Sequence, residues 1–121
     1  MPKVSVIIVT WQAHPYLPEL FASLKGQTFR DFETIVVDNH STDETVAWIR
    51  EHALWADLRP QSTNTGYGTG CNIGIQAARG ELIYFLDEDS RPLPQSLRRG
   101  LAHFQDPEVQ TEIKRGVKER L

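Results

Sequence analysis

The sequence predicts an α/β fold built on a mostly parallel β-sheet with helices on its faces. Two observations predict it. Short apolar segments rich in β-branched residues alternate with longer segments in which apolar residues recur every three or four positions. Such an alternation is typical of right-handed β-α-β units, so the strands are expected to run parallel. The first segment, residues 3–10 (KVSVIIVT), is almost continuously apolar, as expected for a central strand covered on both faces.

Four strands and four helices are expected to alternate along the chain. We expect strands at residues 3–10, 32–37, 54–60 and 82–86, and helices at residues 15–27, 41–52, 69–79 and from residue 94 onward. Ser41 and Glu44 match a capping box that would open the second helix. Gly80 is well placed to end the third helix. The last strand is a short apolar run between Gly80 and Pro92, and it is expected to be buried.

The chain is expected to form one domain. Its 121 residues are enough to bury a core. We assign residues 1–106 to this domain. Residues 107–121 are charged and only weakly amphipathic, with Gly116 interrupting the pattern, and are expected to form a C-terminal helix or tail.

Composition excludes several classes of protein. A net charge of -3 argues against general nucleic-acid binding, which usually needs a basic surface. The apolar runs are far shorter than the roughly 20 residues that span a bilayer, and no signal-peptide pattern is present. The single cysteine, Cys71, excludes an internal disulfide. We expect a cytoplasmic location, either free or peripheral to the inner face of the membrane, and leave homo-oligomer formation open.

Polar side chains follow three of the predicted strands. They are Thr10 and Trp11 after the first strand, Asp38 and Asn39 after the second, and Asp87, Glu88 and Asp89 after the last. In parallel α/β sheets, ligands bind outside the carboxyl ends of the strands. Three adjacent carboxylates repel one another, and a hard cation such as Mg²⁺ or Mn²⁺ would relieve that repulsion. The alternative for the acids is a solvated acidic loop.

The ligand that this edge suits is a nucleoside diphosphate bridged by a metal. The glycines of residues 66–70 do not have the spacing or position of a dinucleotide fingerprint, and no P-loop motif occurs. Trp11 can stack on a base, and Asp38 and Asn39 can hydrogen-bond its polar edge. Two alternatives remain: Asp38 serves only to cap the turn at Ser41, and Trp11 belongs to the core.

The chain resembles the nucleotide-binding half of family 2 glycosyltransferases, which have the GT-A fold. The resemblance is carried by PKVSVIIVTW, by SLKGQTFRDFETIVVDNHSTDET and by NTGYGTGCNIGIQAARGELIYFLDEDSRPLP, in family order and over residues 2–104. It implies a GT-A, Rossmann-like sheet that is truncated relative to a full catalytic domain. It also implies a nucleotide-sugar donor, UDP- or dTDP-linked.

The resemblance assigns roles to residues that match the family's motifs. The end of the first strand, Thr10 and Trp11, would lie at the base, with Asp38 and Asn39 binding it. Asp89, the last acid of the D-x-D-like motif, would coordinate Mn²⁺ or Mg²⁺. Asp87 or Glu88 would face the ribose or a metal-bound water, and Asp87 is a second candidate metal ligand. Asn64, Gly66 and Asn72 match the pattern that lines the sugar-nucleotide side.

Two departures from the family pattern limit what the resemblance implies. Trp11-Gln12 replaces the usual Tyr-Asn pair, and no motif of the acceptor-binding half, which supplies the general base, follows residue 104. The resemblance as a whole still implies a glycosyltransferase that transfers a sugar to an acceptor hydroxyl with inversion. The alternatives are a non-catalytic donor-binding or assembly module and a related nucleotidyltransferase. The last is disfavoured because residues 10–14 lack a glycine-rich basic loop.

Overall fold

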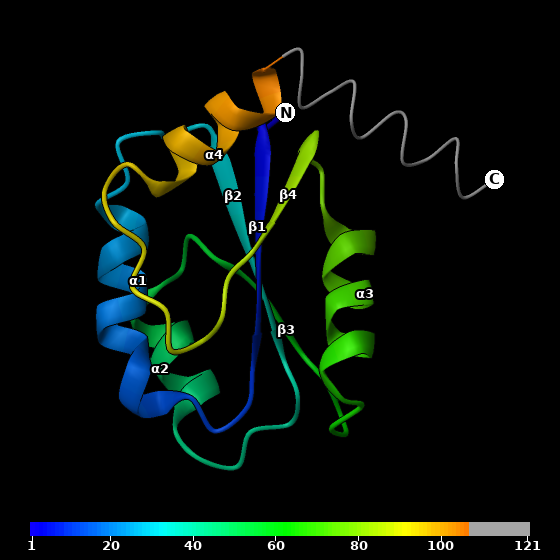
Figure 1. The fold of residues 1–121 in the computed structure, drawn as a ribbon. Helices are drawn as coiled ribbons and strands as arrows, with labels where there is room; N and C mark the ends of the chain where they lie inside the picture. Colours follow the sequence, from blue (N-terminus) through cyan, green and yellow to red (C-terminus); the bar gives the residue numbers. More distant parts are fainter. Residues whose placement is uncertain (107–121) are drawn as a thin grey trace, which may run out of the picture.

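The computed structural model describes residues 1–106 as a four-stranded parallel sheet with helices on both faces (Figure 1). The strands are β1 (Val4–Thr10), β2 (Phe32–Asp38), β3 (Asp57–Pro60) and β4 (Leu82–Phe85). The helices are α1 (Leu17–Lys25), α2 (Thr45–His52), α3 (Tyr67–Ala77) and α4 (Ser96–Gln105), and a single 3-10 turn, His14–Tyr16, precedes α1. The predicted α/β class and parallel sheet are confirmed.

The strand order in the sheet is β3-β2-β1-β4, so β1 is central. β1 pairs with β2 along its whole length, from Val4 opposite Phe32 to Thr10 opposite Asp38. It pairs with β4 only as far as Ile7 opposite Phe85. The chain leaving β4 therefore runs beside the last residues of β1, and this register brings the acids after β4 to the carboxyl end of the sheet.

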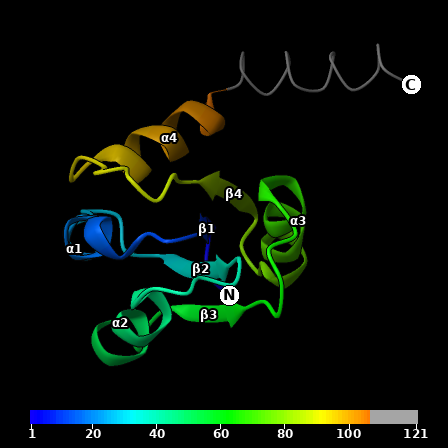
Figure 2. The same cartoon turned by 90° about the horizontal axis from the view of Figure 1, so that it is seen from below.

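Two layers of helix enclose the sheet. Figure 2 shows α3 alone on one face, with α1, α2 and α4 on the other. The larger core lies on the side of α1 and α2, and its fully buried members include Val6, Ile8, Leu20 and Val36. Because β1 is covered on both faces, nearly all of its side chains are buried. This explains the near-continuous apolar sequence of the strand.

α3 approaches β1 very closely through two glycines. A Cβ atom on Gly74 would lie 2.5 Å from Cγ2 of Ile7, and one on Gly70 would lie 2.8 Å from Cγ1 of Val9. The two glycines are four residues apart and therefore lie on the same face of the helix. They form a groove that receives the side chains of alternate β1 residues. Close packing thus compensates for the low helix propensity of glycine.

Two expected helix boundaries were wrong. α2 begins at Thr45, and Ser41 is not its cap, because the Ser41 hydroxyl oxygen accepts from the N–H of Gln12 and not from an N–H of the helix. α3 begins at Tyr67, two residues earlier than expected, and ends before Gly80. Gly80 has another role, since a Cβ atom there would lie 2.6 Å from the backbone nitrogen of Ser5.

The expectation of a buried last strand was also wrong. Within residues 1–106, β4 pairs only with β1, and its side chains are half-buried or exposed, with Phe85 45% exposed. No helix in this part of the chain is long and apolar enough to cross a membrane. The helix or tail predicted for residues 107–121 lies outside the described residues.

One buried hydroxyl group on β2 has no hydrogen-bond partner. Thr34 is 2% exposed, and its Oγ1 is unpartnered among the described residues. Thr45 is the contrasting case, because its Oγ1 donates to Asp43 and accepts from the N–H of Ala13. An unpartnered buried hydroxyl costs stability, since it gives up its hydrogen bonds to water.

Replacing Gly74 tests the contact between α3 and β1. Gly74→Ala is expected to lower the free energy of unfolding by about 1–3 kcal/mol, because the new methyl group overlaps Ile7. Gly68→Ala is the matched control in the same helix, with nothing within 4 Å of the added atom. It is expected to be neutral or to stabilise by up to about 1 kcal/mol. Urea denaturation measures both, and equal effects would exclude this steric account.

Replacing the two threonines tests the cost of the unpartnered hydroxyl. Thr34→Val keeps the shape and removes the oxygen, and is expected to raise the free energy of unfolding by about 1 kcal/mol. Thr45→Val removes a partnered hydroxyl and is expected to lower it by about 1–3 kcal/mol. Urea denaturation of the two variants gives the comparison. A loss of stability in Thr34→Val would contradict the assignment.

Candidate functional site

The carboxyl ends of β1, β2 and β4 meet at one edge of the sheet. Thr10 lies directly opposite Asp38, and the N–H of Asn39 donates to the carbonyl of Thr10 at 2.8 Å. The N–H of Trp11 donates to Oε2 of Glu88 at 2.8 Å. Residues from three separate segments are therefore joined at this edge by hydrogen bonds.

The Asp38 carboxylate fastens the ends of β1 and β2. Asp38 is 1% exposed, and it accepts hydrogen bonds from the Thr10 hydroxyl (2.8 Å), the Ser41 N–H (2.9 Å) and the Ser41 hydroxyl (2.6 Å). Both of its oxygens are used within the protein. The capping role considered from sequence is therefore present, and contact of Asp38 with a base stays a prediction.

Asn39 fastens the loop that leads to α3. Its Nδ2 donates to the carbonyl of Gly66 at 2.9 Å, and its Oδ1 accepts a longer hydrogen bond from Thr65. The side chain of Asn64 accepts from the N–H of Gly66, which has a left-handed backbone with φ of 89°. The structure thus brings Asn39, Asn64 and Gly66 together, and their contact with a ligand stays a prediction.

Glu88 is a half-buried acid among other acids. Burial raises its pKa first, and the nearby carboxylates of Asp89, Asp38 and Asp87 raise it further, while the hydrogen bond from Trp11 opposes them. Asp87 and Asp89 themselves are exposed. The edge therefore concentrates negative charge that a cation would neutralise.

A cavity of about 290 Å³ lies at these acids. It is lined by Val9, Tyr16, Tyr67, Asp87, Glu88 and Asp89. Within residues 1–106 no three His, Cys, Asp or Glu side chains form a ready metal-ligand set. Mg²⁺ and Mn²⁺ bound with phosphates, however, need only one or two protein carboxylates, since phosphate oxygens and water complete the shell. The exposed Asp87 and Asp89 fit a cation of that kind.

Two tyrosines, Tyr16 and Tyr67, also line this cavity and were not predicted as site residues. A hydrogen bond with Cys71, burial and the Asp87 carboxylate raise the pKa of Tyr67. Tyr16 reaches the cavity from the 3-10 turn before α1. A hydrophobic-pattern analysis gives no signal for either, because both are about half-exposed and each enters through a turn or a helix start.

Gln12 holds the turn that follows β2. It has a left-handed backbone with φ of 52°, and its Oε1 accepts from the N–H groups of Thr42 (2.6 Å) and Asp43 (3.3 Å). Its own N–H donates to the Ser41 hydroxyl. Gln12, which differs from the usual family residue, therefore joins the loop after β1 to the loop after β2 by hydrogen bonds.

Two polar residues near these segments make no described contact with the acids of the site. Asn72 is exposed on α3, two residues from both Gly70 and Gly74, and therefore lies on the side of the helix opposite the face that contacts β1. No described hydrogen bond joins it to the site, so its role stays a prediction. Arg91, which follows the acids in the sequence, forms an ion pair with Glu19 of α1 rather than with Asp87.

The family model described as Glycosyl transferase family 2 matches residues 5–118. The chain belongs to this family. One family 2 relative is an uncharacterized glycosyltransferase of Nostoc sp., 34% identical over 110 residues that cover 88% of this chain and 34% of the relative. Another is the poly(ribitol-phosphate) beta-N-acetylglucosaminyltransferase TarS of Staphylococcus aureus, 32% identical over 111 residues, 88% of this chain and 19% of TarS.

Solved structures extend the family 2 match to the fold. Residues 1–349 of S. aureus TarS in complex with UDP superpose with a TM-score of 0.78 at 31% identity, covering 85% of this chain and 32% of that one. The mannosyltransferase PcManGT of Pyrobaculum calidifontis, in complex with GDP-Man and Mn²⁺, gives 0.79 at 27% identity, covering 88% and 33%. The fold is therefore GT-A. The chain spans about a third or less of the length of these proteins.

Asp38→Asn tests how far the site depends on this carboxylate. Both carboxylate oxygens of Asp38 accept hydrogen bonds, whereas the asparagine side chain has only one oxygen that can accept them. The free energy of unfolding is therefore expected to fall by about 1–3 kcal/mol. Asp57→Asn, which weakens an exposed pair with Arg59, is the control and is expected to change it by less than about 1 kcal/mol. Urea denaturation of both variants checks this, and equal effects would contradict it.

Proposed function

We propose that this chain forms the donor-binding part of a glycosyltransferase that binds a nucleoside diphosphate sugar through Mn²⁺ or Mg²⁺. In this proposal the sugar is transferred to an acceptor hydroxyl with inversion. Family 2 membership and the complexes of its structural neighbours with UDP, UDP-GlcNAc and GDP-Man support a nucleotide-sugar donor. A uridine or thymidine nucleotide is our first expectation, and guanosine enters through the mannosyltransferase neighbour.

The observation that carries the proposal is the acidic cavity at the carboxyl end of the sheet. Three of its six lining residues are acids, and none is Lys or Arg. A diphosphate carries negative charge and would be repelled from such a wall unless a cation lay between them. Asp89, with Asp87 beside it, is the proposed ligand of that cation.

The other end of the site suits a base and a ribose. Trp11 is 53% exposed although its backbone is held by Glu88, so its ring is free to stack on a flat base. Asp38 and Asn39 are buried and engaged, and we propose that they position Thr10, Ser41 and Gly66 around the base. Asn64 and Gly66 would line the path toward the sugar.

Bound at Asp89, the metal would neutralise the charge that develops on the departing nucleoside diphosphate. The protein's own groups would hold the donor in line for attack: Trp11 the base, and Tyr16 and Tyr67 the wall beside the acids. An inverting transfer also needs a carboxylate base on the acceptor side. We assign that role to no residue of this chain.

A second candidate is a donor-binding or assembly module that does not transfer the sugar. The exposed apolar side of β4, with Phe85 45% exposed and a strand edge unpaired within the described residues, favours it. The two candidates differ in one respect: only the enzyme releases UDP from UDP-GlcNAc when an acceptor is present.

Calorimetric titration of UDP into the protein tests the donor site. With Mn²⁺ we expect saturable binding, with EDTA none, and with Asp89→Asn binding at least about tenfold weaker, because the cation loses its main protein ligand. Asp31→Asn is the matched control, an exposed acid at the opposite end of β2, and is expected to bind UDP as the parent chain does.

Two outcomes would contradict the proposal. One is a folded protein that binds none of UDP, dTDP and GDP in the presence of Mn²⁺. The other is UDP binding that EDTA leaves unchanged, since an acidic wall without a cation offers nothing to a diphosphate.

A further inference from the structure

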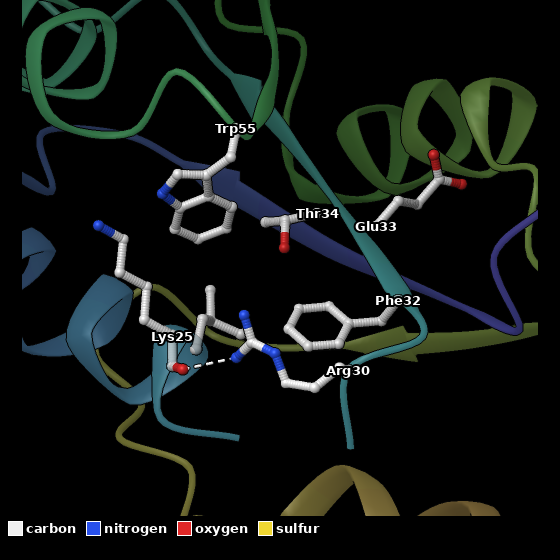
Figure 3. Close-up of a pocket in the computed structure, with 7 residues that line it drawn as sticks. Lys25, Arg30, Phe32, Glu33, Thr34 and Trp55 are labelled. Atoms are coloured by element: carbon white, nitrogen blue, oxygen red, sulfur yellow. Dashed lines mark hydrogen bonds between the residues drawn. The ribbon is translucent and has the colours of Figure 1, made fainter. Parts of the chain in front are cut away.

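A larger cavity lies away from the donor site, beside the start of β2. Its volume is about 550 Å³, and it is lined by Leu24, Lys25, Arg30, Phe32, Glu33, Thr34 and Trp55 (Figure 3). Thr34 precedes Asp38 by four residues of extended strand, about 13 Å. This cavity is therefore separate from the acids after β4, and nothing in the proposed donor chemistry uses it.

The walls of the cavity are mostly apolar. Phe32 and Trp55 face the space from opposite sides in Figure 3, and the buried Leu24 also lines it. Trp55 is 42% exposed yet its ring is held by an edge contact with Phe21, at 5.5 Å between ring centroids. Aromatic walls fixed in this way suit a flat or compact apolar group.

The charges at the cavity are positive. The Arg30 guanidinium is held in place because it donates to the carbonyl of Lys25 at 2.6 Å. No described contact engages the Lys25 ammonium group. Glu33 lines the cavity, but its carboxylate points away and binds Ser5 and Arg79 on the other face of the sheet (Figure 3). Two cationic residues thus line the cavity, Arg30 among its walls and Lys25 at its edge, and no carboxylate points into it.

One polar group in the wall lacks a partner. The Thr34 hydroxyl, buried and without a hydrogen bond among the described residues, points into the space bordered by Trp55, Phe32 and Arg30 (Figure 3). Orphan hydroxyl groups are rare in folded proteins because they cost stability. The hydroxyl oxygen is closed off from water in this conformation, so a ligand oxygen would reach and satisfy it after a small movement of the cavity wall.

We propose that this cavity binds a small amphipathic acid, an organic molecule with an apolar ring and a carboxylate. The ring lies between Trp55 and Phe32, an oxygen of the ligand accepts from the Thr34 hydroxyl, and the negative charge faces Lys25 and Arg30. Apolar walls with a few convergent polar groups in a cavity of this size are the usual form of a small-molecule site. The proposal is independent of donor binding.

The test compares 2-naphthoate with 2-naphthamide, which share a ring and a carbonyl oxygen and differ in charge. Each is titrated into the ¹⁵N-labelled chain and followed by two-dimensional NMR. With 2-naphthoate we expect saturable shifts of the Thr34 amide and the Trp55 indole signals. Affinity for 2-naphthamide is expected to be about tenfold weaker, since it lacks the charge that two cations attract.

Variants separate the contributions. Lys25→Met is expected to weaken 2-naphthoate about threefold and leave 2-naphthamide unchanged, while Arg50→Met, an exposed cation of α2, changes neither. Thr34→Val is expected to weaken both about threefold, because both lose a hydrogen bond. UDP with Mn²⁺ is expected not to displace 2-naphthoate.

Equal affinity for the acid and the amide, or shifts that do not centre on Thr34 and Trp55, would overturn the proposal. So would equal effects of Lys25→Met and Arg50→Met. These outcomes are read from signals at the start of β2, so they remain interpretable whether or not UDP binds.

Discussion

The buried Asp38 carboxylate is the interaction on which the site depends. It holds the hydroxyl of Thr10 at the end of β1 and both donor groups of Ser41 beyond β2. With Ser41 fixed, the N–H of Gln12 has an acceptor, and the Gln12 side chain can in turn hold the Thr42–Asp43 turn. A buried carboxylate with all of its bonds made is stabilising, whereas one that lost them would be costly. These hydrogen bonds join the two loops into one edge of the site.

Close packing of α3 on β1 is the second constraint, and it links the core to the site. Gly70 and Gly74 let Val9 and Ile7 enter the helix surface, and that contact fixes the height of α3 against the sheet. The start of the helix then presents Gly66 to Asn39 and Tyr67 to the acids. The same sheet supports chemistry of opposite sign at its two ends: carboxylates at the carboxyl ends of β2 and β4, and cations beside the start of β2.

Much of the fold could be predicted, and the errors have local causes. The strands and the parallel sheet followed from apolar runs that only a doubly covered strand explains. Ser41 was expected to cap a helix, but its hydroxyl oxygen accepts from the N–H of Gln12, and the helix begins four residues later. The start of α3 was placed late because residues 61–70 are polar and rich in glycine, a composition typical of a loop. β4 looked buried because it is apolar, whereas apolar residues also line a sheet edge that is exposed in the described part of the chain.

The sequence by itself determined the α/β class, the family resemblance and the edge at which polar residues gather, because these depend on local pattern and on the end of each strand. Tertiary structure alone decided which partners those residues have. Glu88 meets Trp11, Arg91 meets Glu19 rather than Asp87, and Tyr16 joins the acids. It also decided that Thr34 faces a cavity with its hydroxyl unpartnered among the described residues. The reason is physical: hydrogen bonds, ion pairs and cavities form between residues far apart in the chain, at distances set by strand register and helix packing.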